Sequence, residues 1–247
     1  MAVLVEAVAC RYGDVVQAAA GGAKRVELVN AIELGGLTPS FGTVARSLEV
    51  GLPIVAMLRP RPAGFCYDRG EYETMLTDAG AMLRMGIAGF VTGISTEDGR
   101  LDTLRMADLR QLAPDRQWVC HRAFDATPDP FEAMEALIAI GFTRILTSGQ
   151  RPTAMEGMAV IAELVRRAAG RIEILAAGGI RPHNVADLVS ATGVTQVHLA
   201  PYAFLPDPST ALRPEIKFGI PEIPREDTYR ETDPDAIAAV VSAANAV

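Results

Sequence analysis

Three observations in the sequence predict a single (β/α)₈ barrel, an α/β fold of the TIM type. The chain has 247 residues, an ordinary length for eight βα units in one domain. Short runs rich in apolar residues alternate along it with segments of helical period. Glycines 21, 86, 141 and 193 each end a helical segment shortly before an expected strand, at intervals that fit two βα units of about 25–30 residues.

Each expected strand is followed by one expected helix. Several of the strands are nearly continuous apolar runs, as buried parallel strands require. We predict strands at Val3–Ala9, Arg25–Val29, Ile54–Arg59, Gly89–Gly93, Gln117–Arg122, Thr143–Ser148, Glu173–Ala177 and Thr195–Ala200. We predict helices at Asp14–Ala20, Phe41–Glu49, Tyr72–Met85, Asp102–Leu112, Pro130–Ile140, Ala154–Ala169, Asn184–Ala191 and Asp235–Ala246. This unbroken alternation favours a closed barrel over an open doubly wound sheet.

One segment departs from this alternation. Residues 201–232 are rich in proline and charge and show no sustained period. We therefore expect one domain spanning residues 1–247, with an irregular segment before its last helix. A loop of this length is usually functional or mobile, so we expect it to cross the barrel mouth or to lie along a contact between subunits.

Composition limits the class of partner and the compartment. The net charge is −7, and no basic run interleaved with aromatic residues occurs, which argues against a nucleic-acid partner. No apolar stretch approaches the roughly 18 residues that span a bilayer, and no basic segment precedes an apolar one at the N-terminus. The three cysteines are far apart and do not suggest a disulfide framework. We expect a cytoplasmic protein without a membrane segment.

Five polar residues occupy positions where barrel strands normally present apolar side chains to the interior: Glu6, Glu27, Arg59, His121 and His198. Alternate strand residues face the interior, and the last of them line the mouth. Because an unpaired buried charge is costly, we predict that the five form one connected polar cluster. The two glutamates are candidate general acids or bases. Structural ion pairing with the arginine and histidines is the alternative.

The loops after the third and fifth strands carry further candidates. Arg59 and Arg61 flank a proline, and their guanidinium groups suit bidentate binding of a carboxylate or phosphate. His121 ends the fifth strand and could act as general base, proton shuttle or metal ligand. Asp125 could orient that histidine or bind a ligand itself. Solvated loop arginines and a structural histidine are the alternatives.

The loops after the sixth and seventh strands predict an anion site. Both carry small and polar residues that let backbone N–H groups approach a ligand: Ser148, Gly149 and Gln150, then Gly178, Gly179 and Arg181. A helix follows the second loop, and its N-terminus is the positive end of its dipole. Alternatively, the glycines only permit tight βα turns.

Several of these stretches together resemble the copper homeostasis protein CutC family. The similar stretches run from about Leu4 to His198: residues 25–28 (RVEL), 35–40 (GGLTPS), 59–61 (RPR), 65–67 (FCY), 121–125 (HRAFD), 145–150 (ILTSGQ) and 178–181 (GGIR). The resemblance implies a TIM-type barrel, a cytoplasmic homo-oligomer and a role in copper handling, with copper as the bound ion.

The sequence departs from the family pattern at two cysteine positions. Many members have a cysteine two residues after the first-strand glutamate and another after the second-strand Glu-Leu, where this chain has Val8 and Val29. Thiolates are the ligands that copper(I) prefers. Cys10 and Cys66 remain as candidate ligands, whereas Cys120 precedes an inward residue and should face the helices. We therefore do not expect a compact thiolate site.

Three functions remain open on the sequence. The resemblance implies a copper-handling, copper-binding protein. The polar mouth indicates an enzyme that performs acid–base chemistry on a small anionic substrate, phosphorylated or carboxylate. A barrel that binds a metabolite or partner proteins without catalysis is the third.

Overall fold

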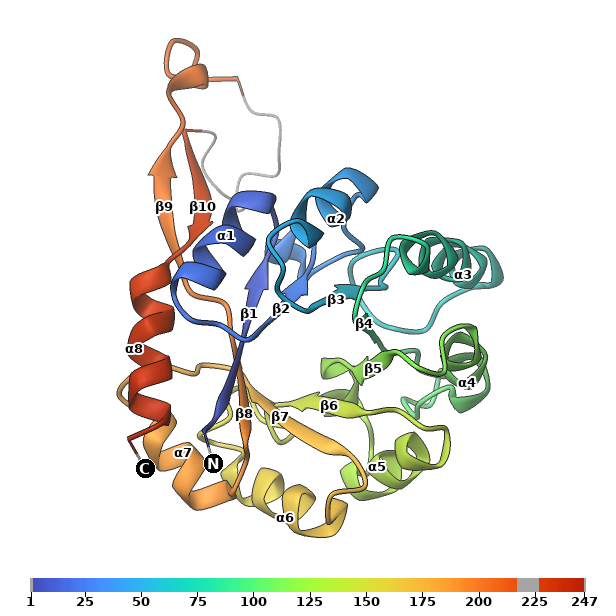
Figure 1. Cartoon of the computed structure of the whole chain (residues 1–247). Coiled ribbons are helices and arrows are strands. Elements are labelled where there is room, and N and C mark those ends of the chain that lie inside the picture. The colour runs from blue at the N-terminus through green and yellow to red at the C-terminus, as the bar shows by residue number, and fades with distance from the viewer. Residues whose placement is uncertain (1, 217–226, 247) are drawn as a thin grey trace.

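The computed structural model describes residues 2–216 and 227–246. Eight parallel strands close into a barrel in chain order, with the last strand paired to the first, which confirms the predicted fold (Figure 1). The strands are β1 (Leu4–Ala9), β2 (Arg25–Leu28), β3 (Ile54–Met57), β4 (Gly89–Thr92), β5 (Gln117–Cys120), β6 (Arg144–Thr147), β7 (Glu173–Ala177) and β8 (Gln196–Leu199).

Helices surround the barrel in Figure 1. They are α1 (Tyr12–Ala20), α2 (Phe41–Leu48), α3 (Arg69–Leu83), α4 (Thr103–Leu112), α5 (Pro130–Ala139), α6 (Met158–Ala168), α7 (Val185–Thr192) and α8 (Pro234–Ala244). Short 3₁₀ helices lie in loops of the described residues: η1 (Ile32–Leu34), η2 (Arg122–Ala126) and η3 (Pro208–Thr210). Within the described ranges, none of the helices combines the length and the apolar character needed to cross a membrane.

Glycines with a left-handed backbone follow more helices than the four glycines at two-unit intervals predicted. The glycines with positive φ that follow a helix are Gly22, Gly51, Gly86, Gly141, Gly170 and Gly193. They occur after α1, α2, α3, α5, α6 and α7, so the repeating unit is one βα unit rather than two. Gly21 ends α1 as predicted, but its φ is −73°, and the next residue, Gly22, takes the left-handed conformation.

Strand alternation sorts the apolar side chains into two packed layers. The larger layer lies between the sheet and the helices and includes Cys120, which faces the helices as expected. The smaller layer fills the barrel interior with Val8, Val29, Val55, Met57, Val91, Val119, Leu146, Leu175 and Ala177. This inner layer fills the barrel, so the barrel is a packed core and not a pore. The layer also supports the polar groups at the mouth.

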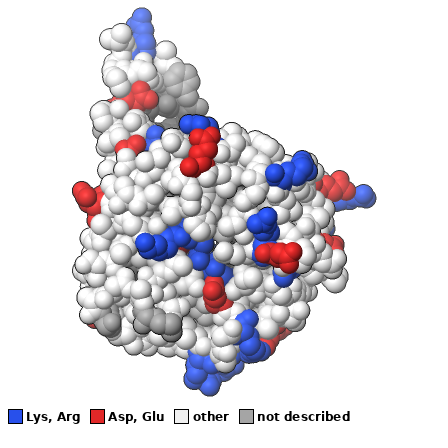
Figure 2. All heavy atoms as spheres, viewed as in Figure 1, with Lys and Arg blue, Asp and Glu red and all other residues white. Residues whose placement is uncertain are grey.

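The segment expected to be irregular contains a two-stranded antiparallel sheet. Strands β9 (Tyr202–Pro206) and β10 (Thr228–Thr232) pair along their full length, and residues 217–226 of the segment lie outside the described residues. The pair, here called the arm, projects from the rounded body of the barrel (Figures 1 and 2). At its base, the Thr232 N–H donates to Asp14 at 3.1 Å, which ties β10 to α1.

Candidate functional site

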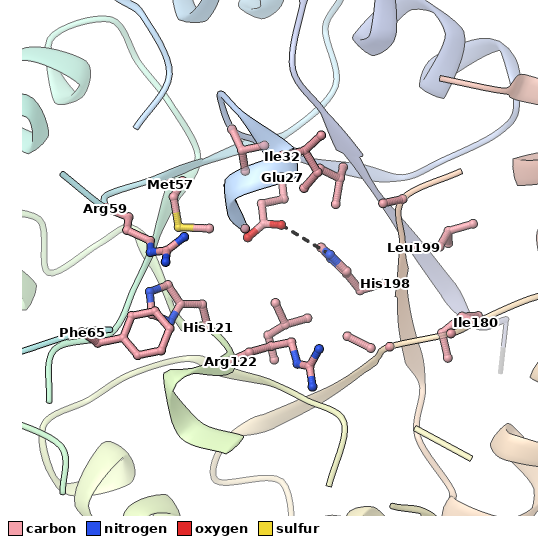
Figure 3. Close-up of a pocket in the computed structure, with 18 of the residues that line it drawn as sticks. Glu27, Ile32, Met57, Arg59, Phe65, His121, Arg122, Ile180, His198 and Leu199 are labelled. Carbon is pink, nitrogen blue, oxygen red and sulfur yellow. Dashed lines mark ion pairs between the residues drawn. The ribbon is translucent and has the colours of Figure 1, made fainter. Parts of the chain in front are cut away.

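A cavity of about 350 Å³ opens at the C-terminal ends of the strands. Its polar side chains come from β2, from β8 and from the loops after β3, β5 and β7: Glu27, Arg59, His121, Arg122, Arg181 and His198. Gly178 and Gly179 also line it. Figure 3 shows Glu27 and His198 facing each other on one side of the cavity, with Arg59, Phe65 and His121 grouped on the other. Seven of the fifteen predicted site residues therefore share one cavity: Glu27, Arg59, His121, Gly178, Gly179, Arg181 and His198.

Glu6 lies beneath this cavity rather than in its wall. Its carboxylate forms an ion pair with Arg25 and lies 2.8 Å from Nδ1 of His198. Arg25 in turn donates to the Gln196 side chain at 2.7 Å. The predicted single cluster is therefore divided: Glu6, His198 and Glu27 contact one another, whereas Arg59 binds backbone carbonyls instead of either glutamate.

Glu27 is a buried carboxyl group that is only partly paired. Its Oε2 lies 3.4 Å from Nε2 of His198, and its Oε1 has no hydrogen-bond partner among the described residues. Burial, together with the nearby charge of Glu6, raises the pKa of Glu27 to about 7. A carboxyl group with a pKa near neutrality can both accept and release protons under physiological conditions.

The surroundings of the other two members of this chain of contacts favour their charged forms. Burial alone would raise the pKa of Glu6, but the hydrogen bond with His198 and the charge of Arg25 outweigh burial and lower it to about 2. Burial also disfavours the charged form of His198, yet the carboxylates of Glu27 and Glu6 together raise its pKa above the ordinary value. Two carboxyl groups therefore stabilise the imidazolium form of His198, which lies between them.

His121 is arranged as a hydrogen-bond donor rather than as a base. Its Nδ1 accepts the backbone N–H of Ala123 at 3.1 Å, so the ring hydrogen lies on Nε2, which has no partner in the described part of the chain. Burial and the charge of Arg59 lower the pKa of His121 to about 3. The ring packs against Phe65 with centroids 4.7 Å apart. This geometry favours a fixed neutral donor over the predicted general base or metal ligand.

The position of His121 depends on the absence of a side chain at residue 93. A Cβ on Gly93 would lie 2.6 Å from Cε1 of His121 and 2.8 Å from Cβ of Ala123. We expect Gly93→Ala to lower the free energy of unfolding by about 1–3 kcal/mol, the usual cost of overpacking, and to displace the imidazole. Denaturant unfolding measures the first effect, and Gly80→Ala on α3, where an added Cβ meets nothing within 4 Å, is the matched control. Equal stability of the two variants would contradict the expectation.

Arg59 contributes a fixed positive charge to the cavity wall. Its guanidinium is buried and donates to the backbone carbonyls of Leu34 (2.9 Å), Gly36 (3.1 Å) and Ala63 (2.6 Å). No carboxylate in the described ranges forms an ion pair with it. Arg61, by contrast, pairs with Glu71 and carbonyls of its own loop, and it is absent from the cavity lining. Of the two predicted ligand-binding arginines, only Arg59 therefore meets the cavity.

The backbone amides predicted to bind an anion after β6 are occupied by a carboxylate of the chain itself. Asp125 accepts the N–H groups of Ser148 (3.0 Å) and Gln150 (3.1 Å) and the hydroxyl of Thr147 (2.5 Å). Neither Asp125 nor any residue of 148–150, Gly149 included, lines the cavity. This part of the predicted site is structural, and it fastens the loop after β5 to the loop after β6.

Arg122 lines the cavity although the sequence did not single it out. It donates from Nε to Asp125 at 2.8 Å and from Nη2 to the Ser148 hydroxyl at 2.6 Å, so the same carboxylate orients it. The alternation of β5 sends residue 122 away from the interior, but the 3₁₀ turn η2 brings its side chain over the mouth (Figure 3).

The loop after β7 keeps its donors available. No acceptor in the described ranges binds the backbone N–H groups of Gly178, Gly179 or Ile180. Arg181 is exposed and lines the cavity; its guanidinium donates to the Ile180 carbonyl at 2.7 Å, and its backbone N–H donates to the Asn184 side chain at 2.8 Å. In Figure 2, basic side chains gather near the middle of the visible face, with acidic groups beside them. The loop supplies neutral and charged donors as expected.

The thiols are not arranged to bind copper(I). Cys10 lines a neighbouring cavity of about 300 Å³ beside the arm, and burial, with the charge of Asp14, raises its pKa to about 11. Cys66 is exposed, and burial raises the pKa of Cys120 behind the sheet. Across residues 2–216 and 227–246, no three His, Cys, Asp or Glu side chains come together as a metal site. Copper(I) prefers thiolates, and separated thiols, two of which have raised pKa values, do not fit it.

Comparison with known proteins places the chain in a family. The CutC family model matches residues 3–203. The chain belongs to the CutC family. A CutC family protein of Treponema denticola is 44% identical over 238 residues, which are 96% of this chain and 97% of the relative. One of Mesorhizobium japonicum is 41% identical over 230 residues, or 93% and 89% of the two chains.

Solved structures agree with this assignment. A CutC protein of Streptococcus agalactiae, named for copper homeostasis, superimposes with a TM-score of 0.75 at 32% identity, over 79% of this chain and 97% of that one. Phosphoribosylanthranilate isomerase of Thermotoga maritima, at 14% identity and a TM-score of 0.57 over 99% of this chain and 100% of that one, shares the fold alone. The CutC match covers β1 to β8 and the whole mouth, and it ends at residue 203 within β9.

Proposed function

We propose that this CutC protein is an enzyme that performs acid–base chemistry on a small anionic substrate at the barrel mouth. The observation that carries the proposal is Glu27, whose Oε1 is buried at the cavity without a hydrogen-bond partner among the described residues. Burying a polar group without a partner costs free energy, and proteins tolerate that cost mainly at functional sites. A pKa near 7 suits this carboxyl group to proton transfer.

The charge around the cavity supports an anionic substrate. Three arginines line it, and neither Arg59 nor Arg181 has a carboxylate partner in the described ranges. The free N–H groups of residues 178–180 add neutral donors on the same wall. A phosphate or carboxylate held by both kinds of donor gains charge-assisted hydrogen bonds of about 1.5–3 kcal/mol each. The cavity volume of about 350 Å³ restricts the substrate to a small molecule.

The roles of the side chains follow from their protonation states. Glu27 takes a proton from the substrate or returns one. The neutral His121 donates from Nε2 to a substrate oxygen on which negative charge develops, since a donor fixed in advance stabilises that charge most effectively. The arginines hold the anionic group and so orient the reacting atoms.

Copper handling, the first expectation, receives less support from the geometry. The name of the family refers to copper, but the thiols of this chain are separated and two of them are held protonated. Copper binding therefore stays outside the proposal. The cytoplasmic location and the self-association implied by the family remain predictions.

Phosphate should raise the melting temperature of the wild-type protein more than that of Arg181→Ala. A ligand at 100 times its dissociation constant adds about 2.7 kcal/mol to the stability of the folded state. For a domain of this size that corresponds to roughly 5–10 °C. Arg116→Ala is the matched control, because this exposed arginine precedes β5 at the opposite end of the barrel. The scans use sodium chloride to match ionic strength, and equal shifts in all three proteins would mean a general salt effect.

A further inference from the structure

His198 lies between two buried carboxyl groups at the junction of three neighbouring strands. Its Nδ1 is 2.8 Å from Oε1 of Glu6 on β1, and its Nε2 is 3.4 Å from Oε2 of Glu27 on β2. The strand register brings Glu6 and His198 together, since Glu6 is opposite His198 on β8. On its other side Glu6 is opposite Arg25 of β2, and Glu27 lies two residues beyond Arg25 on the same strand. Figure 3 shows the contact between Glu27 and His198 as a dashed line.

The charges around Glu6 keep it ionised. Arg25 forms an ion pair with the Glu6 carboxylate. Arg144 on β6 adds a positive charge from across the barrel, although Arg144 itself forms an ion pair with Glu173 of β7 at 2.6 Å. The register neighbours of His198 on β7 and of Glu27 on β3 are the apolar residues Ala177 and Val55. Within the described ranges, the carboxylates that contact His198 are therefore only those of Glu6 and Glu27.

An ionised Glu6 determines which nitrogen of His198 carries a fixed hydrogen. A carboxylate only accepts hydrogen bonds, so Nδ1 at 2.8 Å must be the donor. The other nitrogen, Nε2, then faces Glu27 and is free to hold or to release a proton. Only the second oxygen of Glu27, Oε1, is left for a ligand.

We propose that Glu6, His198 and Glu27 form a buried proton relay in which Glu6 is a positioning residue that holds His198 with its hydrogen on Nδ1. One proton moves between Nε2 of His198 and Oε2 of Glu27. The transfer converts an imidazolium and a carboxylate into an imidazole and a carboxylic acid, so the net charge of the site does not change. The raised pKa of Glu27, at about 7, and that of His198 agree with a shared proton. Its catalytic use rests on the proposed function, whereas the arrangement belongs to the free protein.

The test is a ¹⁵N NMR titration of the full-length, ligand-free protein. The chain has only three histidines, so the imidazole signals of His121, His183 and His198 can each be assigned. We expect wild-type His198 to carry hydrogen on Nδ1 throughout and to be an imidazolium at pH 6. Glu6→Gln should lower the proton affinity of His198 about tenfold or more, which is a shift of about one pH unit. The resonances of exposed His183 serve as the internal control.

A purely structural Glu6 would leave the titration of His198 unchanged, and an unchanged midpoint in folded Glu6→Gln overturns the relay. If that variant does not fold, the wild type decides alone, because neutral His198 with hydrogen on Nε2 at pH 6 also overturns it. Glu27→Gln, which keeps Glu6, should lower the midpoint while the Nδ1 hydrogen remains. If the titrations give the expected results but phosphate does not bind, the proposed function is contradicted and the relay is not.

Discussion

Glu27→Gln should gain stability relative to the wild type as the pH rises from about 4.5 to 7. The pKa of Glu27 is raised from 4.5 to about 7 in the folded protein, so the folded state binds more protons than the unfolded state between these values. Stability conferred by the protonated group is therefore present below pH 4.5 and is lost as the pH rises through 7. Glutamine keeps the shape of the side chain but cannot ionise.

The expected difference is on the order of 3 kcal/mol, since each unit of pKa shift corresponds to about 1.4 kcal/mol. Loss of the Glu27 carboxylate also removes one cause of the raised pKa of His198. This effect further increases the stability of Glu27→Gln relative to the wild type as the pH rises. Urea unfolding of both proteins at several pH values from 4 to 8.5 measures the difference. Glu97→Gln, at an exposed position, is the matched control. A constant difference between Glu27→Gln and the wild type would show that Glu27 ionises normally.

Glu6 should behave in the opposite way. Its pKa is lowered from 4.5 to about 2, so its contribution is present above pH 4.5 and is lost as the pH falls through 2. Glu6 and Glu27 lie on paired strands, two register positions apart. Ionised Glu6 nevertheless stabilises the fold, whereas ionised Glu27 destabilises it. An arrangement that costs stability at neutral pH is expected where function requires it.

The barrel could be predicted because its signals are local. The alternation of apolar runs with helical period locates each strand of the barrel to within about two residues, and glycines with a left-handed backbone mark most helix ends. The arm could not be predicted in this way. Its five-residue strands lie in a segment rich in proline and charge, and their pairing joins β9 to a strand more than twenty residues away.

The site could be predicted only in part, because alternation indicates which way a side chain faces but not its depth. Glu27, Arg59, His121 and His198 were placed at the mouth correctly, whereas Glu6 lies deeper with Arg25. Depth depends on the offset between neighbouring strands, which places Glu6 opposite Arg25 and Val8 opposite Glu27. The sequence of either strand alone does not contain that offset.

Side-chain contacts within and between loops could not be predicted from the sequence either. Arg122 and Asp125 are three residues apart, and a ligand-binding role for the acid was a reasonable interpretation of that loop. In the structure the acid is held by the loop after β6, and the arginine is the residue that lines the cavity. The turn η2 decides this outcome, and its direction depends on tertiary contacts.

The wild-type protein should bind copper(I) weakly, and the double substitution Val8→Cys/Val29→Cys should increase its affinity about a hundredfold or more. Both valines line the mouth cavity, Val8 from β1 and Val29 as the residue after β2, and the Val29 N–H donates to the Ala9 carbonyl at 2.9 Å. Cysteines there would present two thiols on neighbouring strands to one cavity. Two ligands held close together gain a chelate advantage of about 10²–10⁴ over one.

Anaerobic titration against a chromophoric copper(I) chelator measures this affinity. Each single cysteine variant is a matched control, because one thiol lacks the chelate advantage and should bind little better than the wild type. Cys66→Ser tests the exposed native thiol, and we expect it to leave affinity unchanged in every background. Tight binding by the wild type that Cys66→Ser abolishes would show that the ligands are misassigned. The expected pattern would instead mean that two positions in the cavity wall decide copper(I) binding, while Glu27 and the arginines remain available for chemistry that does not need the ion.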